Sequence, residues 1–91
     1  MGSQYKANFR CVILSAKRRV FEDEINSLFV TGDQGEYEIL AYHYPLIGIV
    51  KGDLVINWEK RLQVKGGVLR FFANECNIIV EEKISEQAKE S

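Results

Sequence analysis

The segment VTGDQGEYEILAYHYPL, residues 30–46, separates two series of short apolar runs and organises the fold we expect for this chain. It holds two of the seven glycines, the only proline, the only histidine and three of the four tyrosines. Gly32 and Gly35 suit a turn, because glycine adopts positive φ angles that other residues resist. Pro45 removes a backbone donor and favours an extended residue before it. We therefore expect a turn, a brief strand over residues 36–40 and then a loop.

Short apolar runs with turn residues between them continue on both sides of this segment. The runs predict strands over residues 5–15, 19–24, 25–30, 46–50, 54–58, 61–65, 68–73 and 76–81. Leu54, Ile56 and Trp58 share one face by the two-residue period of a strand. Residues 51–53 and 59–60 read as turns, and the glycines at 66–67 as a bulge or corner. No helical period precedes the charged tail. The pattern predicts an all-β fold with nine or ten strands, a β-sandwich or flattened barrel.

Length and charge exclude several classes of protein. A chain of 91 residues forms one domain with one modest core. Its 12 basic and 13 acidic residues leave no electrostatic footprint for nucleic acid, since such binding neutralises several phosphates. No apolar stretch approaches the ~20 residues that cross a bilayer, and the polar start does not resemble a signal peptide. We expect a soluble domain that binds no nucleic acid.

No arrangement of residues indicates catalysis, a cofactor or a metal. The sequence lacks Cys-x-x-Cys, His-x-x-x-His and a glycine-rich phosphate loop ending in lysine. Cys11 and Cys76 lie in apolar runs, which favours buried free thiols over a disulfide. A nucleophile needs a nearby base, and no partner for His43 is identifiable from spacing. We expect no catalytic residue, no cofactor and no metal ligand.

Several residues of the central segment have two readings each. His43 is either a loop histidine that packs on a neighbouring tyrosine and bonds a carbonyl, or a contact for a partner protein. The tyrosines at 37, 42 and 44 belong either to the core or to a contact surface, where amphipathic rings are enriched. Glu36 and Glu38 either face solvent or contact a polar partner.

At this segment the chain resembles the epsilon subunit of F-type ATP synthases, called delta in mitochondria. The family's run is roughly Pro-Gly-x-x-Gly-(Glu)-Phe-Gly-Ile-Leu-Pro-x-His-x-Pro-Leu, and residues 31–46 follow it in register. A second signature is an alternating strand, Gly-Gly and a hydrophobic strand ending at an asparagine turn, which residues 62–80 match. The opening over residues 9–25 also fits. The resemblance spans residues 9–80.

The resemblance implies a ten-stranded sandwich and a non-catalytic subunit. Residues 4–82 would form the sandwich domain, and residues 83–91 would be a charged tail, the stub of a helical region. Family members usually continue into a C-terminal helical hairpin that can inhibit hydrolysis and in some members binds ATP. Because this sequence ends at Ser91, we expect the hairpin to be absent and the chain not to bind ATP.

The resemblance also implies partners and a location. The subunit belongs to the rotor stalk, where it links the gamma subunit to the membrane c-ring and couples ion-driven rotation to ATP synthesis or hydrolysis. Glu36 and His43 would face the loops of the c-ring, with Glu38 and Tyr42 beside them. The protein would be peripheral to the membrane through its complex, on the cytoplasmic face of the bacterial inner membrane or the equivalent organelle membrane.

Two departures from the family pattern affect this surface. Glu38 stands where the family prefers glycine; if that position requires a positive φ, the backbone there carries strain of about 1–3 kcal/mol. Ala41 replaces a common proline, which loosens the approach to His43.

Two other classes of function compete with this one. The first is a stand-alone β-barrel that binds a ligand or nucleic acid, which the absence of a basic stripe with interleaved aromatics disfavours. The second is a small enzyme using His43 with Glu36 or Glu38, which the absence of an evident cleft disfavours. Copurification separates the three. A stalk subunit predicts a gamma subunit and ring components, and a binding module predicts nucleic acid or a ligand. An enzyme predicts a turnover that His43→Ala abolishes.

Overall fold

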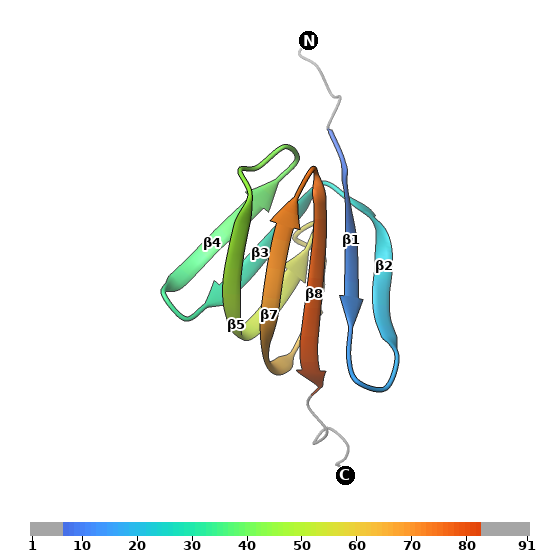
Figure 1. Cartoon of the computed structure of the whole chain (residues 1–91), viewed down its shortest axis with the longest axis vertical. Helices are drawn as coiled ribbons and strands as arrows, with labels where there is room; N and C mark the ends of the chain where they lie inside the picture. Colours follow the sequence, from blue (N-terminus) through green and yellow to red (C-terminus); the bar gives the residue numbers. More distant parts are fainter. Residues whose placement is uncertain (1–6, 83–91) are drawn as a thin grey trace.

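The computed structural model describes residues 7–82, which form eight β-strands and no helix (Figure 1). The strands are β1 (Phe9–Leu14), β2 (Arg19–Ile25), β3 (Ser27–Gly32), β4 (Gly35–Leu40), β5 (Leu46–Ile56), β6 (Lys60–Leu62), β7 (Val64–Phe72) and β8 (Glu75–Glu82). The predicted all-β class is confirmed. The predicted tail over residues 83–91 lies outside the described residues.

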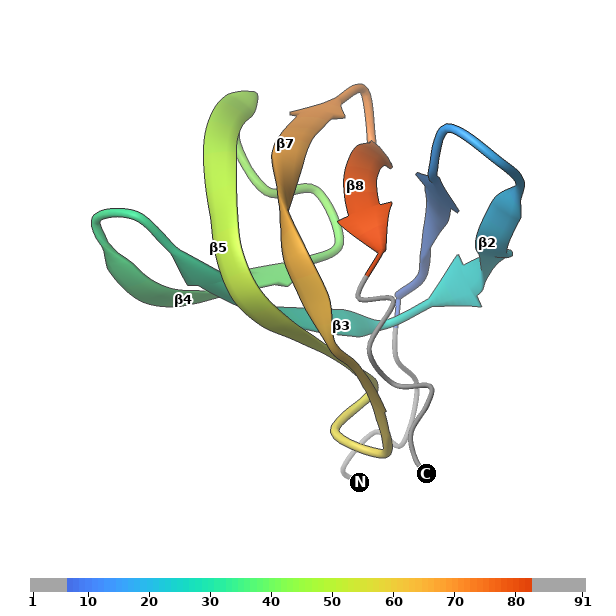
Figure 2. The same ribbon diagram turned by 90° about the horizontal axis from the view of Figure 1, so that it is seen from below.

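The strands form a sandwich because β5 belongs to both of its layers. The strand order is β2-β1-β8-β7-β5-β3-β4, with β6 also paired to β5. Residues 46–50 of β5 pair with β7, whereas residues 54–56 pair with β3 and β6. Figure 2 shows the result, with β3 and β4 running across the direction of β7 and β8. All pairs are antiparallel except β1 with β8.

The predicted count of nine or ten strands is wrong. Two expected breaks lie inside continuous strands, and the expected strand over residues 61–65 is divided at Gln63 between β6 and β7. Residues 51–53, predicted as a turn, continue β5 as it passes from one layer to the other. Residues 66–67 lie within β7, where a register shift between Val64 and Gly66 marks the expected bulge. A Cβ on Gly67 would lie 2.3 Å from the carbonyl oxygen of Ile79, so this glycine permits the close approach of β7 and β8.

The core follows the alternation of the strands. Ile13, Leu69 and Ile78 are fully buried or nearly so, on the three central strands β1, β7 and β8. The rings of Phe9 and Phe71 meet edge to face with centroids 5.5 Å apart, an arrangement aromatic pairs favour. Buried Leu28 and Val30 of β3 and Ile39 of β4 belong to the same core, so residues of both layers contribute to it.

Trp58 does not share the face of Leu54 and Ile56, contrary to the prediction from its spacing. Leu54 and Ile56 are buried, but β5 ends before Trp58, which is 59% exposed. Asn57 and Trp58 have φ angles of 53° and 56° and form the reversal that was expected at residues 59–60. The Asn57 Oδ1 accepts hydrogen bonds from the backbone N–H groups of Asn26, at 2.9 Å, and Ser27, at 3.2 Å. Asparagine tolerates a left-handed conformation, and these bonds hold the turn at this point.

Candidate functional site

The two candidate carboxylates lie on the outward side of β4. Glu36 and Glu38 are exposed, while Tyr37 and Ile39 between and beyond them point inward. The indole Nε1 of Trp58 donates to Glu38 Oε2 at 2.8 Å, so Glu38 has a partner within the domain. Glu38 is not among the residues with positive φ, and the strain considered for this position is therefore absent.

The loop over residues 41–45 is anchored to the hairpin between β7 and β8. The backbone N–H of Tyr42 donates to Asn74 Oδ1 at 2.6 Å, and the Asn74 Nδ2 donates to the carbonyl oxygen of Asn8 at 3.0 Å. The N–H of His43 donates to the carbonyl oxygen of Leu40 at 3.2 Å. Tyr42 has a φ of 65°, an uncommon conformation for a bulky residue, which these bonds offset.

In the structure His43 packs on a neighbouring tyrosine and bonds a carbonyl, which is the first of its two predicted readings. It remains partly exposed. Its ring is half-buried, and its Nδ1 lies 2.8 Å from the carbonyl oxygen of Tyr44. It meets the ring of Tyr44 edge to face at 6.4 Å and that of buried Phe71 at 5.9 Å. The histidine therefore connects the loop to the core, and no carboxylate is bonded to it among the described residues.

The three tyrosines of the central segment divide between the two alternatives. Tyr42 and Tyr44 are 75% and 83% exposed, which makes them contact-surface candidates. Tyr37 packs against the core, and its hydroxyl is buried without a hydrogen-bond partner among the described residues. Burial raises the pKa of this phenol above its ordinary value. A Cβ on Gly48 would lie 2.6 Å from the Tyr37 hydroxyl, so Gly48 makes room for the ring.

The four predicted contact residues form two groups, not one cluster. Glu36 lies beside the β3–β4 turn, whereas Tyr42 and His43 follow the other end of β4. The four residue steps from Glu36 to Leu40 alone span about 13 Å of extended strand. The structure therefore supports two contact points along one edge strand, and it does not bring His43 and the carboxylates together for acid–base chemistry.

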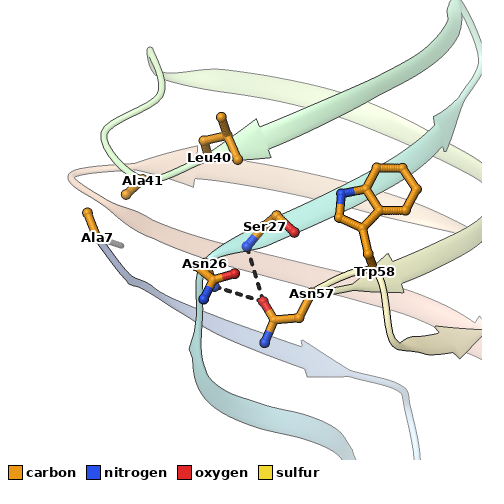
Figure 3. Close-up of a pocket in the computed structure, with 7 residues that line it drawn as sticks. All are labelled: Ala7, Asn26, Ser27, Leu40, Ala41, Asn57 and Trp58. Atoms are coloured by element: carbon orange, nitrogen blue, oxygen red, sulfur yellow. Dashed lines mark hydrogen bonds between the residues drawn. The ribbon is translucent and has the colours of Figure 1, made fainter. Parts of the chain in front are cut away.

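A shallow hollow of about 510 Å³ lies between the end of β4 and the β5–β6 turn (Figure 3). It is lined by Ala7, Asn26, Ser27, Leu40, Ala41, Asn57 and Trp58. Its lining contains a serine but no imidazole or carboxylate to activate it. The Asn57 amide oxygen is occupied by the two backbone donors drawn in Figure 3. The hollow therefore has no residues arranged for catalysis.

A second surface, which the sequence reading did not identify, covers the outward side of β5, β7, β8 and β1. Cross-strand pairing places four exposed aliphatic residues in one row: Ile49 beside Val68, Val68 beside Ile79, and Ile79 beside Leu14. Exposed Ile47 on β5 and Phe72 on β7 extend the row. We call these six residues together with Arg70, which lies between Val68 and Phe72 on β7, the outer face.

The sequence did contain a signal for the outer face. Val68 and Leu69, like Ile78 and Ile79, place apolar side chains at consecutive strand positions, so both sides of the sheet are apolar. Such runs are typical of strands covered on both faces. Within residues 7–82, nothing covers the second face here.

The two cysteines are free and buried, as expected. Cys11 and Cys76 lie directly opposite each other on the parallel strands β1 and β8. The hydrogen bond between the two thiols, and then burial, raises the pKa of Cys76, which disfavours a reactive thiolate. No group of three or more histidine, cysteine or acidic residues is arranged to hold a metal ion in the described part of the chain. Residues 7–82 also contain no helix that could span a membrane.

Comparison with known proteins identifies the family. The family model for the ATP synthase delta/epsilon chain β-sandwich domain matches residues 8–86. An ATP synthase epsilon chain of Psychrobacter sp. (strain PRwf-1) is 40% identical over 68 residues, which cover 69% of this chain and 49% of that protein. The epsilon chain of Wolbachia pipientis subsp. Culex pipiens (strain wPip) is 33% identical over 76 residues, covering 78% and 67%.

Solved structures share the fold at low identity. A chain in the central stalk/c-ring structure of the Tetrahymena thermophila mitochondrial ATP synthase has a TM-score of 0.71 at 14% identity, covering 87% of this chain and 67% of that one. A chain in the Euglena gracilis mitochondrial ATP synthase structure has a TM-score of 0.75 at 15% identity, covering 99% and 61%. The chain spans about half the length of the Psychrobacter relative. With nearly its whole length matched by the family model, this chain belongs to the delta/epsilon β-sandwich family of ATP synthases.

Proposed function

We propose that this chain is a non-catalytic rotor-stalk subunit of an F-type ATP synthase. It links the gamma subunit to the c-ring and couples ion-driven rotation to ATP synthesis or hydrolysis. Its place is peripheral to the membrane through the complex, on the cytoplasmic face of the bacterial inner membrane or the equivalent organelle membrane. Family membership supports the assignment to the complex, and two separate surfaces on one rigid sandwich support a linking role.

We propose that the outer face binds the gamma subunit. Its row of Ile49, Val68, Ile79 and Leu14 runs across four paired strands, so it is a flat and rigid apolar surface. Burying it on a partner would contribute roughly 25 cal/mol for each Å² of apolar surface removed from water, before the cost of association. A stalk subunit that transmits torque needs such a rigid contact.

The edge formed by β4 and the loop after it carries the proposal for the c-ring. The side chain of Glu36 is exposed and forms no hydrogen bond or ion pair among the described residues, so its carboxylate is available to a polar loop. Tyr42 presents an exposed ring from a loop anchored by Asn74. Glu38 and His43 have partners within the domain. We therefore propose that they hold this edge in position and lie at the rim of the contact.

Copurification with the subunits of the same complex tests the first contact. We expect the gamma subunit to copurify with the wild-type chain, and Val68→Asp or Ile79→Asp to abolish this without unfolding the domain. Leu40→Asp is the matched control, because Leu40 is 52% exposed on the other layer. Retention of gamma by both outer-face variants would refute the contact. Copurifying nucleic acid in place of gamma would favour the binding-module alternative.

Ion pumping tests the second contact. In membrane vesicles carrying the assembled complex, Glu36→Arg is expected to reduce ATP-driven ion pumping while ATP hydrolysis continues, because the ring contact is weakened and gamma remains bound. Glu59→Arg makes the same charge change at another exposed position and should leave pumping unchanged. Equal pumping by Glu36→Arg and wild type would count against Glu36 as a ring contact.

A further inference from the structure

Arg70 differs from every other arginine of the chain. The sequence has five arginines, all within the described residues, and four form ion pairs. These pairs are Arg10 with Glu22, Arg18 with Glu82, Arg19 with Glu22 and Arg61 with Asp53. Among residues 7–82, Arg70 has no carboxylate within ion-pair distance, although it is exposed on a central strand.

The surroundings of Arg70 are the apolar outer face. On β7 it lies between exposed Val68 and Phe72, and its guanidinium carbon stands 5.6 Å from the centre of the Phe72 ring. Its cross-strand partners are Ile47 on β5 and Asn77 on β8. The ring contact favours one orientation of the side chain, since a guanidinium stacks on aromatic faces. The cation therefore lies at a defined place within a surface whose other members are apolar.

No acid of the outer face neutralises this cation. Glu75 occupies the diagonal position on β8, opposite Phe72, yet no ion pair joins it to Arg70. The more distant Glu81 pairs with Lys65 at 3.6 Å. Glu22 and Glu24 on β2 pair with Arg10. Within the described chain, Arg70 and Glu75 thus each lack an ion pair, whereas Glu81, Glu22 and Glu24 are paired.

A partner that covers the outer face must deal with this charge. Removing an unpaired guanidinium from water is strongly unfavourable, whereas a bidentate carboxylate compensates for the lost hydration and fixes the register. We infer that the surface of the gamma subunit which docks on the outer face is aliphatic and presents one aspartate or glutamate to Arg70. This inference deepens the proposed function and depends on its assignment of the outer face to gamma.

The same observations argue against a phosphate-bearing occupant. Nucleic acids and anionic membranes are bound by several cations together, and affinity grows with the number of phosphates neutralised. The outer face offers one unpaired arginine among the described residues, with apolar Val68, Phe72 and Ile47 beside it. A single carboxylate within an apolar protein surface matches that pattern of charge and hydropathy.

The test measures binding of this chain to the gamma subunit of its own complex. Isothermal titration calorimetry should show that Arg70→Glu raises Kd about 30-fold or more, because two carboxylates would then face each other in the interface. Arg70→Lys should recover part of the affinity, because it keeps the charge without the planar fork. Arg61→Glu is the matched control on the other layer, and its Kd should change less than about 3-fold, as at a surface pair. Circular dichroism should show that all three variants remain folded.

A charge swap makes the test specific. Scanning acidic residues of gamma to arginine should find one position that restores binding to Arg70→Glu and weakens binding to wild type. If Val68→Asp abolishes binding while Arg70→Glu does not change it, the inference is wrong and the proposed contact stands. If Arg70→Glu and Arg61→Glu weaken binding equally, the effect comes from the overall electrostatic field of the domain and not from a local contact. The inference then also fails. If Val68→Asp binds gamma normally, the outer-face assignment itself is wrong.

Discussion

The outer face and the loop over residues 41–45 are both exposed, but they are held in place in different ways. Side chains of the outer face rise from β7 and β8, whose backbones are hydrogen-bonded to neighbouring strands on both sides. The loop follows the edge strand β4 and is tied to the rest of the domain by a few bonds, above all those of Asn74.

This difference has a consequence for function. Positions on a central strand are set by the whole sheet, so a single surface substitution changes the chemistry of the outer face and leaves its shape intact. Positions in the loop depend on individual side chains, so one substitution can change shape and chemistry together. A rigid contact with gamma and an adjustable contact with a ring would each suit its own surface.

The largest effect is expected directly beneath the outer face. Leu69→Ala removes a fully buried side chain of β7 and should lower the free energy of unfolding by about 2–5 kcal/mol, measured by urea denaturation. Ile79→Ala, at a side chain 62% exposed on the neighbouring strand, should change it by no more than about 0.5 kcal/mol. A comparable loss in both variants would mean that the outer face is part of the core and not a free surface.

A smaller effect is expected at the anchor of the loop. Asn74→Ala removes the bonds to Tyr42 and Asn8 and places alanine at a φ of 60°, at a cost of about 1–3 kcal/mol. Asn74→Gly removes the same bonds but accepts the φ angle, so the difference between the two variants isolates the backbone strain. Hydrogen exchange at the Tyr42 amide should accelerate in both. An unchanged exchange rate would show that other contacts hold the loop.

His43 should show an effect of about 1 kcal/mol. His43→Ala removes the edge-to-face contact with buried Phe71, and aromatic pairs of this kind contribute about 0.5–1.5 kcal/mol. Such a change lowers Tm by about 4–8 °C in a domain of this size. Tyr44→Ala, at a ring 83% exposed, should leave Tm nearly unchanged. If thermal unfolding of His43→Ala matches wild type, the histidine is free to act as a partner contact alone.

The same contrast explains what could be predicted from the sequence. Alternation of polar and apolar side chains indicates strands directly, and glycines indicate turns and bulges. The all-β fold, the turn after Gly32 and the bulge near Gly66 were therefore predicted correctly. Breaks at residues 51–53 were not real, since a glycine-containing segment can bend within a strand as well as end it. The outer face was missed because an apolar run looks the same whether its second side meets more protein or a partner.

The candidate site was harder to predict, because its geometry depends on residues far apart in the sequence. The loop is anchored by Asn74, 32 positions from Tyr42, and Glu38 is held by Trp58, 20 positions away. Neither pairing follows from local spacing. The sequence placed Glu36 at the surface but left Tyr42 open between the core and a contact surface. The division of the four residues into two groups required the length and direction of β4.

The smallest expected effect lies at the end of the outer face, where Glu82 of β8 ties down the turn after Leu14. Glu82 accepts hydrogen bonds from the Ser15 hydroxyl, at 2.6 Å, and from the Arg18 guanidinium, at 3.0 Å, and these two partners lower its pKa. A carboxyl group whose pKa is lower in the folded state stabilises the fold above its unfolded pKa of about 4.3. That contribution is lost as the pH falls through the lowered value. Glu82→Gln retains an acceptor without the charge, so its stability should lie slightly below wild type at pH 7 and converge with it in acid. Urea denaturation between pH 2 and pH 7 measures this difference, and a constant gap across that range would show that the charge of Glu82 does not hold the turn.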